Sequence, residues 1–347
     1  MAERPCDSSD SSSDSRSPFA GPCFFDNSNW RRYGCRQVWP HQRSTHNMHP
    51  IHRRDFLKTA AATVAAAAFA PQRLFAEAPS AAARLVVVHG TDIPRMVETG
   101  IQALGGWSGF VQKGQRVTLK VNAAWASTPE QGGNTHPALV EAAIRACQAA
   151  GAASVTLPEN PCSPAAKAFE MSGIGAVAKR TGARLYEPDD DTDFVAVDFP
   201  DGKTLKTAAV VREVVETDCL INMPVAKSHG GAILTVSMKN WMGSVRERGF
   251  WHRAGLHQCI ADFNTRIQAR LIIVDATRIM LTNGPRGPGK LETPNQVLFG
   301  TDPVAVDAYA ATLFKKEPFS IPHIQIAHDT GIGCGDLSKV AIEHLQA

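Results

Sequence analysis

The order of short β-rich runs and longer helical patterns most constrains what this chain can fold into. From residue 85 onward, apolar runs of about four residues alternate with segments whose apolar residues recur every three or four positions. Such alternation is typical of parallel strands joined by crossover helices. We therefore expect an α/β fold with a mostly parallel sheet and crossover helices, either as one body or as two lobes.

Several of the runs are apolar enough to be buried on both faces of a sheet. We expect strands at residues 85–88, 117–121, 154–157, 185–186, 195–199, 219–222, 271–274 and 297–300. We expect helices at residues 93–104, 137–150, 164–180, 255–269 and 303–315. Asp302 is placed to cap the last of these helices, and Asp201-Gly202 is typical of a hairpin turn.

Arg53 and Arg54 open a segment that has the order of a twin-arginine export signal. The pair is followed by Phe-Leu-Lys, then by about a dozen weakly apolar residues, then by small residues. The apolar run is shorter than the roughly 20 residues that a membrane span needs. The alternative is a chance Arg-Arg pair beside an alanine-rich helix. We expect a signal peptide at residues 48–78.

This signal predicts a partner and a location. The partner is the twin-arginine translocase, which carries folded proteins, and the mature protein should be periplasmic or otherwise exported, with no transmembrane anchor after cleavage. Met48 is a better translation start than Met1, so residues 1–47 are expected to be disordered or to precede the true start. Residues 79–347 are expected to form a single α/β domain.

Charge and cysteine content exclude two classes of function. Residues 1–78 hold 10 Lys and Arg against 7 Asp and Glu, which leaves 26 of each in the mature chain. A neutral chain disfavours nucleic acid as a partner. The five cysteines after the signal are widely spaced, without the spacing of a cluster or zinc site, so we expect no iron–sulfur cluster. The cofactor and any metal stay open.

Polar residues gather where the expected strands end, which is where open α/β sheets bind ligands. Lys120 and Asn122 follow the second strand, and His136 stands at the start of the helix from Pro137, where free amides favour an anion. Alternatively, Thr135 or His136 caps that helix and Lys120 reaches solvent. Asp275 ends a later strand.

The segment from Asn222 to Gly243 carries the strongest signal. Lys227, His229, Lys239 and Asn240 lie among apolar and small residues, where charged groups are costly to bury unless they are paired or bound to a ligand. A desolvated lysine can act as a base or as a covalent anchor, and histidine can move a proton. The alternative is a mobile loop with two solvated lysines.

Polar residues on two later expected helices are further candidates for a functional site. Asp307, one and a half turns into an alanine-rich helix, is difficult to explain as purely structural. His257 and Asp262 stand five residues apart on one expected helix, so they face different directions and make a poor metal site. The chain has no Gly-x-Ser-x-Gly motif, which disfavours a serine hydrolase.

Taken together, these motifs resemble domain-of-unknown-function family 362 from about residue 85 to residue 315. The resemblance rests on seven short motifs in matching order: Lys120-Val121-Asn122, Thr135-His136-Pro137, Ile221 to Pro224 with Lys227 and His229, Met238-Lys239-Asn240 with Gly243, His257 with Asp262, Gly284-Pro285 with Gly289, and Asp302 to Asp307. The family commonly has Pro where this chain has Val121. Many relatives carry a ferredoxin-like cysteine cluster, which this chain lacks. The resemblance implies no particular reaction.

The leading hypothesis is an exported enzyme that acts on a small anionic substrate, or uses an anionic cofactor, through a Lys/His pocket. Lys227, His229 and Lys239 are the expected catalytic residues. The expected ligand-binding residues are Lys120, Asn122, His136, Asn222, Asn240, Asp275 and Asp307. Redox or proton-transfer chemistry is favoured. The alternative is a ligand-binding or cofactor-delivery protein with the same pocket and no turnover.

Overall fold

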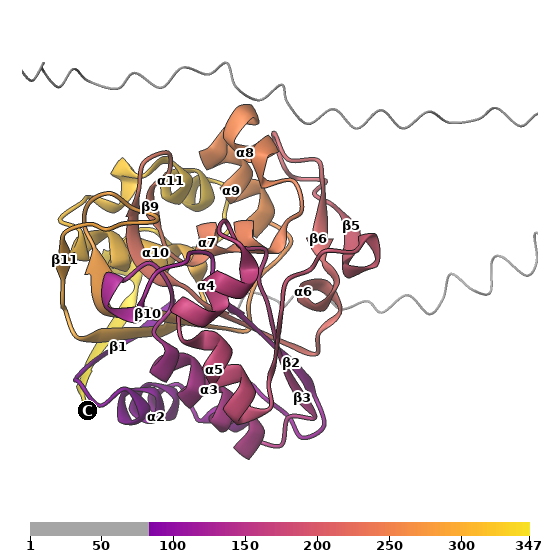
Figure 1. The fold of residues 1–347 in the computed structure, drawn as a ribbon. Helices are drawn as coiled ribbons and strands as arrows, with labels where there is room; N and C mark the ends of the chain where they lie inside the picture. The colour runs from indigo at the N-terminus through magenta and orange to yellow at the C-terminus, as the bar shows by residue number, and fades with distance from the viewer. Residues whose placement is uncertain (1–82) are drawn as a thin grey trace, which may run out of the picture. The chain divides into compact units, whose positions relative to one another are not determined.

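The computed structural model describes residues 83–347, so the signal residues Arg53 and Arg54 and the upstream segment 1–47 lie outside the described residues. One eleven-stranded sheet runs through the described part of the chain (Figure 1). Its main strands, in spatial order, are β13 (Ala341–Gln346), β1 (Arg84–His89), β12 (Gln296–Gly300), β10 (Leu271–Met280), β7 (Cys219–Met223), β2 (Arg116–Val121), β3 (Ser154–Pro158) and β4 (Arg184–Tyr186).

The sheet is mostly parallel, as the sequence predicts. Along the main order, β12 runs antiparallel to both of its neighbours, and every other adjacent pair is parallel. The short strand β11 (Leu291–Glu292) pairs with the end of β10. The strands β5 (Phe194–Asp198) and β6 (Thr207–Val211) form a separate antiparallel hairpin around the expected turn at Asp201-Gly202.

Helices cover both faces of the large sheet. One hydrophobic cluster packs α2 (Ile93–Ala103), α3 (Pro137–Ala149) and α5 (Ile174–Thr181) against the first face, at the bottom of Figure 1. The other cluster packs α9 (Leu256–Asn264), α10 (Pro303–Leu313) and α11 (Pro322–Asp329) against the second face. Strands enclosed in this way read as continuous apolar runs, which explains why their positions were visible in the sequence.

Helix ends follow local sequence signals. The Asp302 side chain caps α10 by accepting from the backbone N–H groups of Val304 (2.8 Å) and Ala305 (3.0 Å), as expected. The single helix expected at 164–180 is instead two, α4 (Ala165–Met171) and α5. Gly173 separates them with a φ of 74°, a left-handed conformation that residues with a side chain rarely adopt. No helix among residues 83–347 combines the length and hydropathy that a membrane span requires.

The segment between β7 and α9 is more structured than a glycine-rich loop. It contains β8 (Val225–His229), β9 (Ile233–Thr235), the one-turn helix α7 (Ser237–Asn240) and α8 (Arg248–Ala254). β8 pairs with the second half of β10, which extends β10 well beyond the expected residues 271–274. This pairing holds Lys227 in a buried strand, opposite Met280 of β10. The helix α6 (Arg212–Glu216) completes the described helices.

Candidate functional site

A cavity of about 160 Å³ lies beyond the carboxyl ends of β2 and β3, between them and the β8–α8 segment. Five of the sequence-predicted residues line it, namely Asn122, Lys227, His229, Lys239 and Asn240. The structure thus brings together side chains from three separate motifs. The volume corresponds to about five water molecules, so it suits a small ligand.

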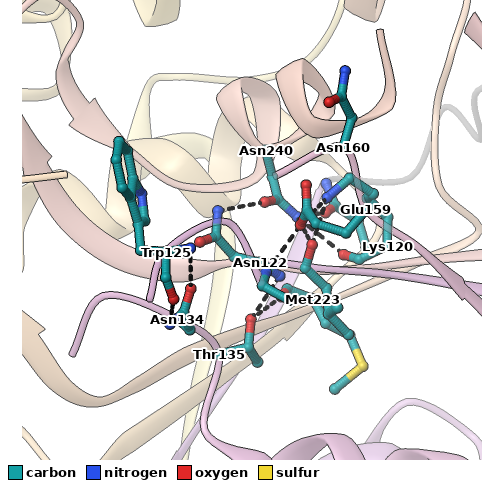
Figure 2. A network of polar contacts seen from close by, with 12 residues as sticks. Lys120, Asn122, Trp125, Asn134, Thr135, Glu159, Asn160, Met223 and Asn240 are labelled. Atoms are coloured by element: carbon teal, nitrogen blue, oxygen red, sulfur yellow. Dashed lines mark hydrogen bonds and ion pairs between the residues drawn. The ribbon is translucent and has the colours of Figure 1, made fainter. Parts of the chain in front are cut away.

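Three asparagines connect the strands beneath this cavity. The Nδ2 of Asn122 donates to Oδ1 of Asn240 (3.0 Å), and the Nδ2 of Asn240 donates to Oδ1 of Asn222 (2.8 Å), as Figure 2 shows in part. Asn222 in turn donates to the backbone carbonyl of Ser237 (2.9 Å). Asn222 is buried and is not among the residues that line the cavity, so its predicted role in ligand binding stays a prediction. Buried amides need partners, and here they provide them for one another.

Lys227 is an almost fully buried cation, with 1% of its surface exposed. Its Nζ donates to Oδ1 of Asn122 (2.9 Å) and to the carbonyl of Gly133. No carboxylate within residues 83–347 forms an ion pair with it. Burial, followed by repulsion from Lys239, lowers the pKa of Lys227 to about 7. Near neutral pH this lysine is therefore poised between its amine and ammonium forms.

Lys239 projects from α7 into the same cavity and is 7% exposed. Its Nζ has one contact among the described residues that counts as a hydrogen bond, with Sδ of Met242 at 3.4 Å, and sulfur is a weak acceptor. Burial is the main cause that lowers the pKa of Lys239 to about 8, and the charge of Arg248 adds to it, although Cys162 opposes the shift. This amine is left with unused donors facing a small cavity.

Arg248 adds a third cationic group to the lining. Its guanidinium donates to the backbone carbonyls of Asn160 and Pro161, and no carboxylate among residues 83–347 forms an ion pair with it. His252, one turn further along α8, also lines the cavity and stacks on His229 with ring centroids 6.2 Å apart. Burial, Lys239 and Arg248 all lower the pKa of His252. The cavity therefore concentrates positive charge.

His229 is held as a neutral imidazole. Its Nδ1 accepts from the backbone N–H groups of Gly231 and Ala232, both at 3.0 Å. Burial and the charge of Lys239 lower the pKa of His229 to about 3. With Nδ1 used as an acceptor, the ring proton resides on Nε2, so His229 can donate a hydrogen bond but is a poor base. This geometry favours hydrogen-bond donation by His229 over the proton transfer that the sequence predicts.

Lys120 and Glu159 form a buried ion pair at the cavity floor. The Nζ of Lys120 lies 2.9 Å from Oε2 of Glu159, and Lys120 has no exposed surface (Figure 2). Burial lowers the pKa of Lys120, and the attraction of Glu159 opposes this shift only in part. Lys120 is thus paired with Glu159 inside the protein. It does not reach solvent, and it is not among the residues that line the cavity. Its partner Glu159 lines the cavity.

Two acidic residues predicted to bind ligand have structural partners instead. Asp307 accepts hydrogen bonds from the backbone N–H groups of Ser237 (2.8 Å) and Met238 (3.2 Å), so it holds the start of α7 from α10. Burial raises the pKa of Asp307 to about 7 despite these bonds. Asp275 forms a buried ion pair with Arg278. Neither residue lines the cavity.

His136 lies away from the cavity as well. The ring Nδ1 of His136 accepts from the backbone N–H of Ala138 (3.2 Å), so His136 caps α3. The backbone N–H of His136 donates to Oδ2 of Asp275 (2.7 Å). The sequence had left capping open as the alternative, and this is what the structure contains. Thr135 next to it ties the loop to β7 by donating to the carbonyl of Met223 (Figure 2).

Sequence reasoning did not select Thr235, Arg248, His252 and Cys162, which also line the cavity. Glu159 follows β3 at its carboxyl end, and the rule that selects Lys120 selects it as well. Arg248 and His252 carry no such signal, because both lie on the short helix α8, whose packing only the fold reveals.

The described residues contain no cluster of three or more His, Cys, Asp or Glu side chains arranged to hold a metal. His257 and His323 make a pair, with their Nδ1 atoms 2.9 Å apart. A larger, mostly apolar cavity of about 690 Å³ lies between α2 and α3, lined by residues such as Trp107 and Ala142. It contains few groups that could perform chemistry, so the smaller polar cavity is the better candidate site.

Comparison with known proteins identifies both parts of the chain. A model described as "Domain of unknown function (DUF362)" matches residues 117–312, and a model of the twin-arginine translocation signal sequence matches residues 50–70, which include Arg53 and Arg54. The predicted signal is thereby confirmed, and it indicates export by the twin-arginine pathway. A thylakoid-associated protein of Synechocystis sp. is 26% identical over 251 residues, which cover 68% of this chain and 74% of that protein.

Two solved structures are similar at low identity. A protein from Thermotoga maritima has a TM-score of 0.41 and 12% identity, covering 68% of this chain and 59% of its own. The lactate racemase apoprotein from Thermoanaerobacterium thermosaccharolyticum has a TM-score of 0.40 and 11% identity, covering 63% of this chain and 54% of its own. The chain therefore spans less than two thirds of either structure.

Proposed function

Because the chain belongs to the DUF362 family, whose description specifies no reaction, we propose a function from the cavity itself: the exported protein binds a small anion there and exchanges a proton with it. The observation that carries this proposal is the pair of buried lysines, Lys227 and Lys239, neither of which has a carboxylate partner among the described residues. A buried ammonium group without a counter-ion is costly, and a bound anion offsets that cost.

The charges around the cavity support an anion more than a cation. Lys227, Lys239 and Arg248 contribute positive charge. Glu159, the one carboxylate that lines the cavity among the described residues, is already paired with Lys120. An anion that enters meets unused donors on Lys239. The export signal places the mature protein outside the cytoplasm, and there the small cavity would bind a freely diffusing small molecule.

Lys239 is the residue best suited to the proton transfer. A base works best when its pKa lies near the working pH, and the pKa of Lys239 is about 8. In its amine form it can take a proton from the bound molecule and return it later. The Nε2–H of neutral His229 would donate a hydrogen bond to an oxygen that gains negative charge in this step. Lys227 would balance the charge of the anion.

The first test measures binding of acetate and of sulfate to the mature protein by isothermal titration calorimetry. We expect both anions to bind, and we expect Lys239→Met to weaken binding by at least about tenfold, which corresponds to one charged hydrogen bond. The matched control is Lys316→Met, because Lys316 is exposed and distant in sequence from the lining. Equal affinities of wild type and Lys239→Met would contradict the proposal.

A second measurement separates an enzyme from the alternative of a binding or delivery protein. Glycolate and glycine are incubated with the mature protein in D₂O, and loss of their C–H signals is followed by proton NMR. Exchange that Lys239→Met abolishes and Lys316→Met preserves supports proton transfer. Binding of these molecules with no exchange above the uncatalysed rate would favour the non-catalytic alternative.

A further inference from the structure

One oxygen of the buried carboxylate at the cavity floor has no hydrogen-bond donor. Oε2 of Glu159 accepts from Nζ of Lys120 and from the backbone N–H of Ala123, both at 2.9 Å. Oε1 of the same carboxylate is buried and accepts no hydrogen bond from any of the described residues. Glu159 as a whole has no exposed surface and yet lines the cavity. A buried acceptor in this state is uncommon in folded proteins.

The chain keeps the space beside this oxygen free of side-chain atoms. Gly243 lies next to it, and a Cβ at that position would approach within 1.9 Å of Oε1 and within 2.9 Å of Nζ of Lys120. The backbone of Gly243 has no left-handed conformation that would explain a glycine there. The absence of a side chain is therefore explained by the close approach of Glu159, and Gly243 also lines the cavity.

A second lining residue has an unused polar atom. Oγ1 of Thr235, at the end of β9, is buried and forms no hydrogen bond with the described residues. A hydroxyl can donate or accept, so it places no restriction on the ligand by itself. Glu159 does place one, because an ionised carboxylate only accepts. The lining thus offers hydrogen-bond donors on Lys239 for an anionic group, and one fixed acceptor on Glu159 for a hydrogen-bond donor of the ligand.

We propose that the ligand is a small organic anion that also carries an O–H or N–H donor, and that Glu159 Oε1 accepts this hydrogen bond while Lys239 binds the anionic group. This inference rests on the proposed function, because it refines which anion the cavity takes. A cavity of about 160 Å³ takes only a small molecule, and short hydroxy acids and amino acids carry both groups within that size. A plain carboxylate or an inorganic anion without a donor leaves Glu159 Oε1 without a partner.

The test compares three molecules of similar size, namely acetate, glycolate and glycine. Acetate has the anionic group alone, whereas glycolate adds a hydroxyl donor and glycine an ammonium donor. Calorimetry with the wild-type mature protein should give at least one donor-bearing molecule an affinity about tenfold or more above that of acetate, since a hydrogen bond to a charged group contributes on this scale. Glycolate and glycine also distinguish the hydroxyl donor from the ammonium donor.

Two variants address the role of Glu159 directly. Gly243→Ala inserts a methyl group at Oε1 without changing any charge, so the preference over acetate should fall to about twofold or less. Lys120→Met/Glu159→Gln removes both charges of the ion pair together, which avoids an unpaired buried lysine, and turns the acceptor into an amide. It should lose the preference as well. Circular dichroism and thermal unfolding show whether each variant is folded.

The outcomes separate this inference from the proposed function. If acetate binds as tightly as glycolate and glycine, and Lys239→Met abolishes all binding, the anion site stands and the donor requirement is overturned. Wild-type selectivity that survives in folded Gly243→Ala also overturns the role of Glu159. If none of the three molecules nor sulfate binds, the proposed function fails and this inference fails with it.

Discussion

At the scale of single residues, the distinctive feature is a set of lysines that burial has made weakly basic. The sequence indicated this, since Lys227 and Lys239 stand among apolar residues where a solvated loop would be polar. It could not indicate which lysine has partners. Lys120 has a carboxylate at 2.9 Å, Lys227 has two neutral acceptors, and Lys239 has a sulfur. These differences arise from contacts between segments distant in sequence.

The lowered pKa of Lys227 predicts how stability depends on pH. Its folded pKa is about 7, against an ordinary value of 10.5 that holds in the unfolded chain. Between these values the unfolded chain binds more protons than the folded protein, so the free energy of unfolding rises with pH. Relative to Lys227→Met, the wild type should gain about 2 kcal/mol between pH 7 and pH 9. Titrating groups that do not interact with Lys227 cancel in this comparison.

Urea unfolding of the ligand-free mature protein at the two pH values measures this gain. Lys316→Met is the control, because an exposed lysine should give a difference from wild type that is nearly independent of pH. A pH-independent difference between wild type and Lys227→Met would mean that Lys227 keeps its ordinary pKa, contrary to its burial.

At the scale of elements, the site depends on a helix of a single turn. α7 carries Lys239 and Asn240 and is too short to be stable by itself. Asp307 holds its first N–H groups from α10, and Asn222 binds the carbonyl of Ser237. Asp307 stands out in the sequence, since an acidic residue in an alanine-rich helix needs an explanation. The sequence could not identify the explanation, which lies seventy residues away.

Removing this support should damage both stability and binding. Asp307→Ala leaves the N–H groups of Ser237 and Met238 buried without an acceptor, so we expect a loss of about 2–4 kcal/mol in the free energy of unfolding. Sulfate affinity should fall because Lys239 is no longer fixed. Asp302→Ala is the matched control, because Asp302 caps α10, the helix that carries Asp307. It should cost about 1 kcal/mol and leave sulfate affinity unchanged. Unchanged sulfate affinity in Asp307→Ala would refute this role.

Regular elements were predictable where a single pattern decided them. β1, β2, β3, β7 and β12 form where buried apolar runs occur, and α2, α3 and α10 begin at the expected positions. β8 and β9 were not found, because their residues include lysine, histidine and paired glycines, which are unusual in strands. Their strand conformation comes from pairing with β10, a tertiary contact that local sequence does not encode.

At the scale of the whole molecule, the chain joins an export signal to a sheet whose strand ends form the cavity. The general rule that ligands bind at carboxyl strand ends predicts the edge of the sheet at which the candidate cavity lies. The same rule also selects His136 and Asp275, but neither lines the cavity. Their hydrogen bonds and ion pair are made within the protein, with the start of α3 and with Arg278. The rule identifies an edge of the sheet, whereas the direction of each side chain depends on packing.

The signal gives a prediction for the full-length protein. Arg53→Lys/Arg54→Lys should stop export and leave an unprocessed precursor in the cytoplasm, because the paired arginines are what the translocase recognises. Fractionation followed by immunoblotting measures this. Lys58→Arg keeps a positive charge after the pair and is the control that should still be exported. Normal export of the double variant would contradict the assignment of this pathway.

The most direct test of the central claim is the pKa of Lys239, measured by NMR on the side-chain Cε and Nζ of the mature protein. In the free protein we expect a value of about 8, because the ammonium group is buried and no carboxylate in the described part of the chain pairs with it. Saturating sulfate or glycolate should raise this pKa, since a bound anion favours the charged form. A pKa near 10.5 that neither anion shifts would contradict the claim that the cavity is a site for small anions.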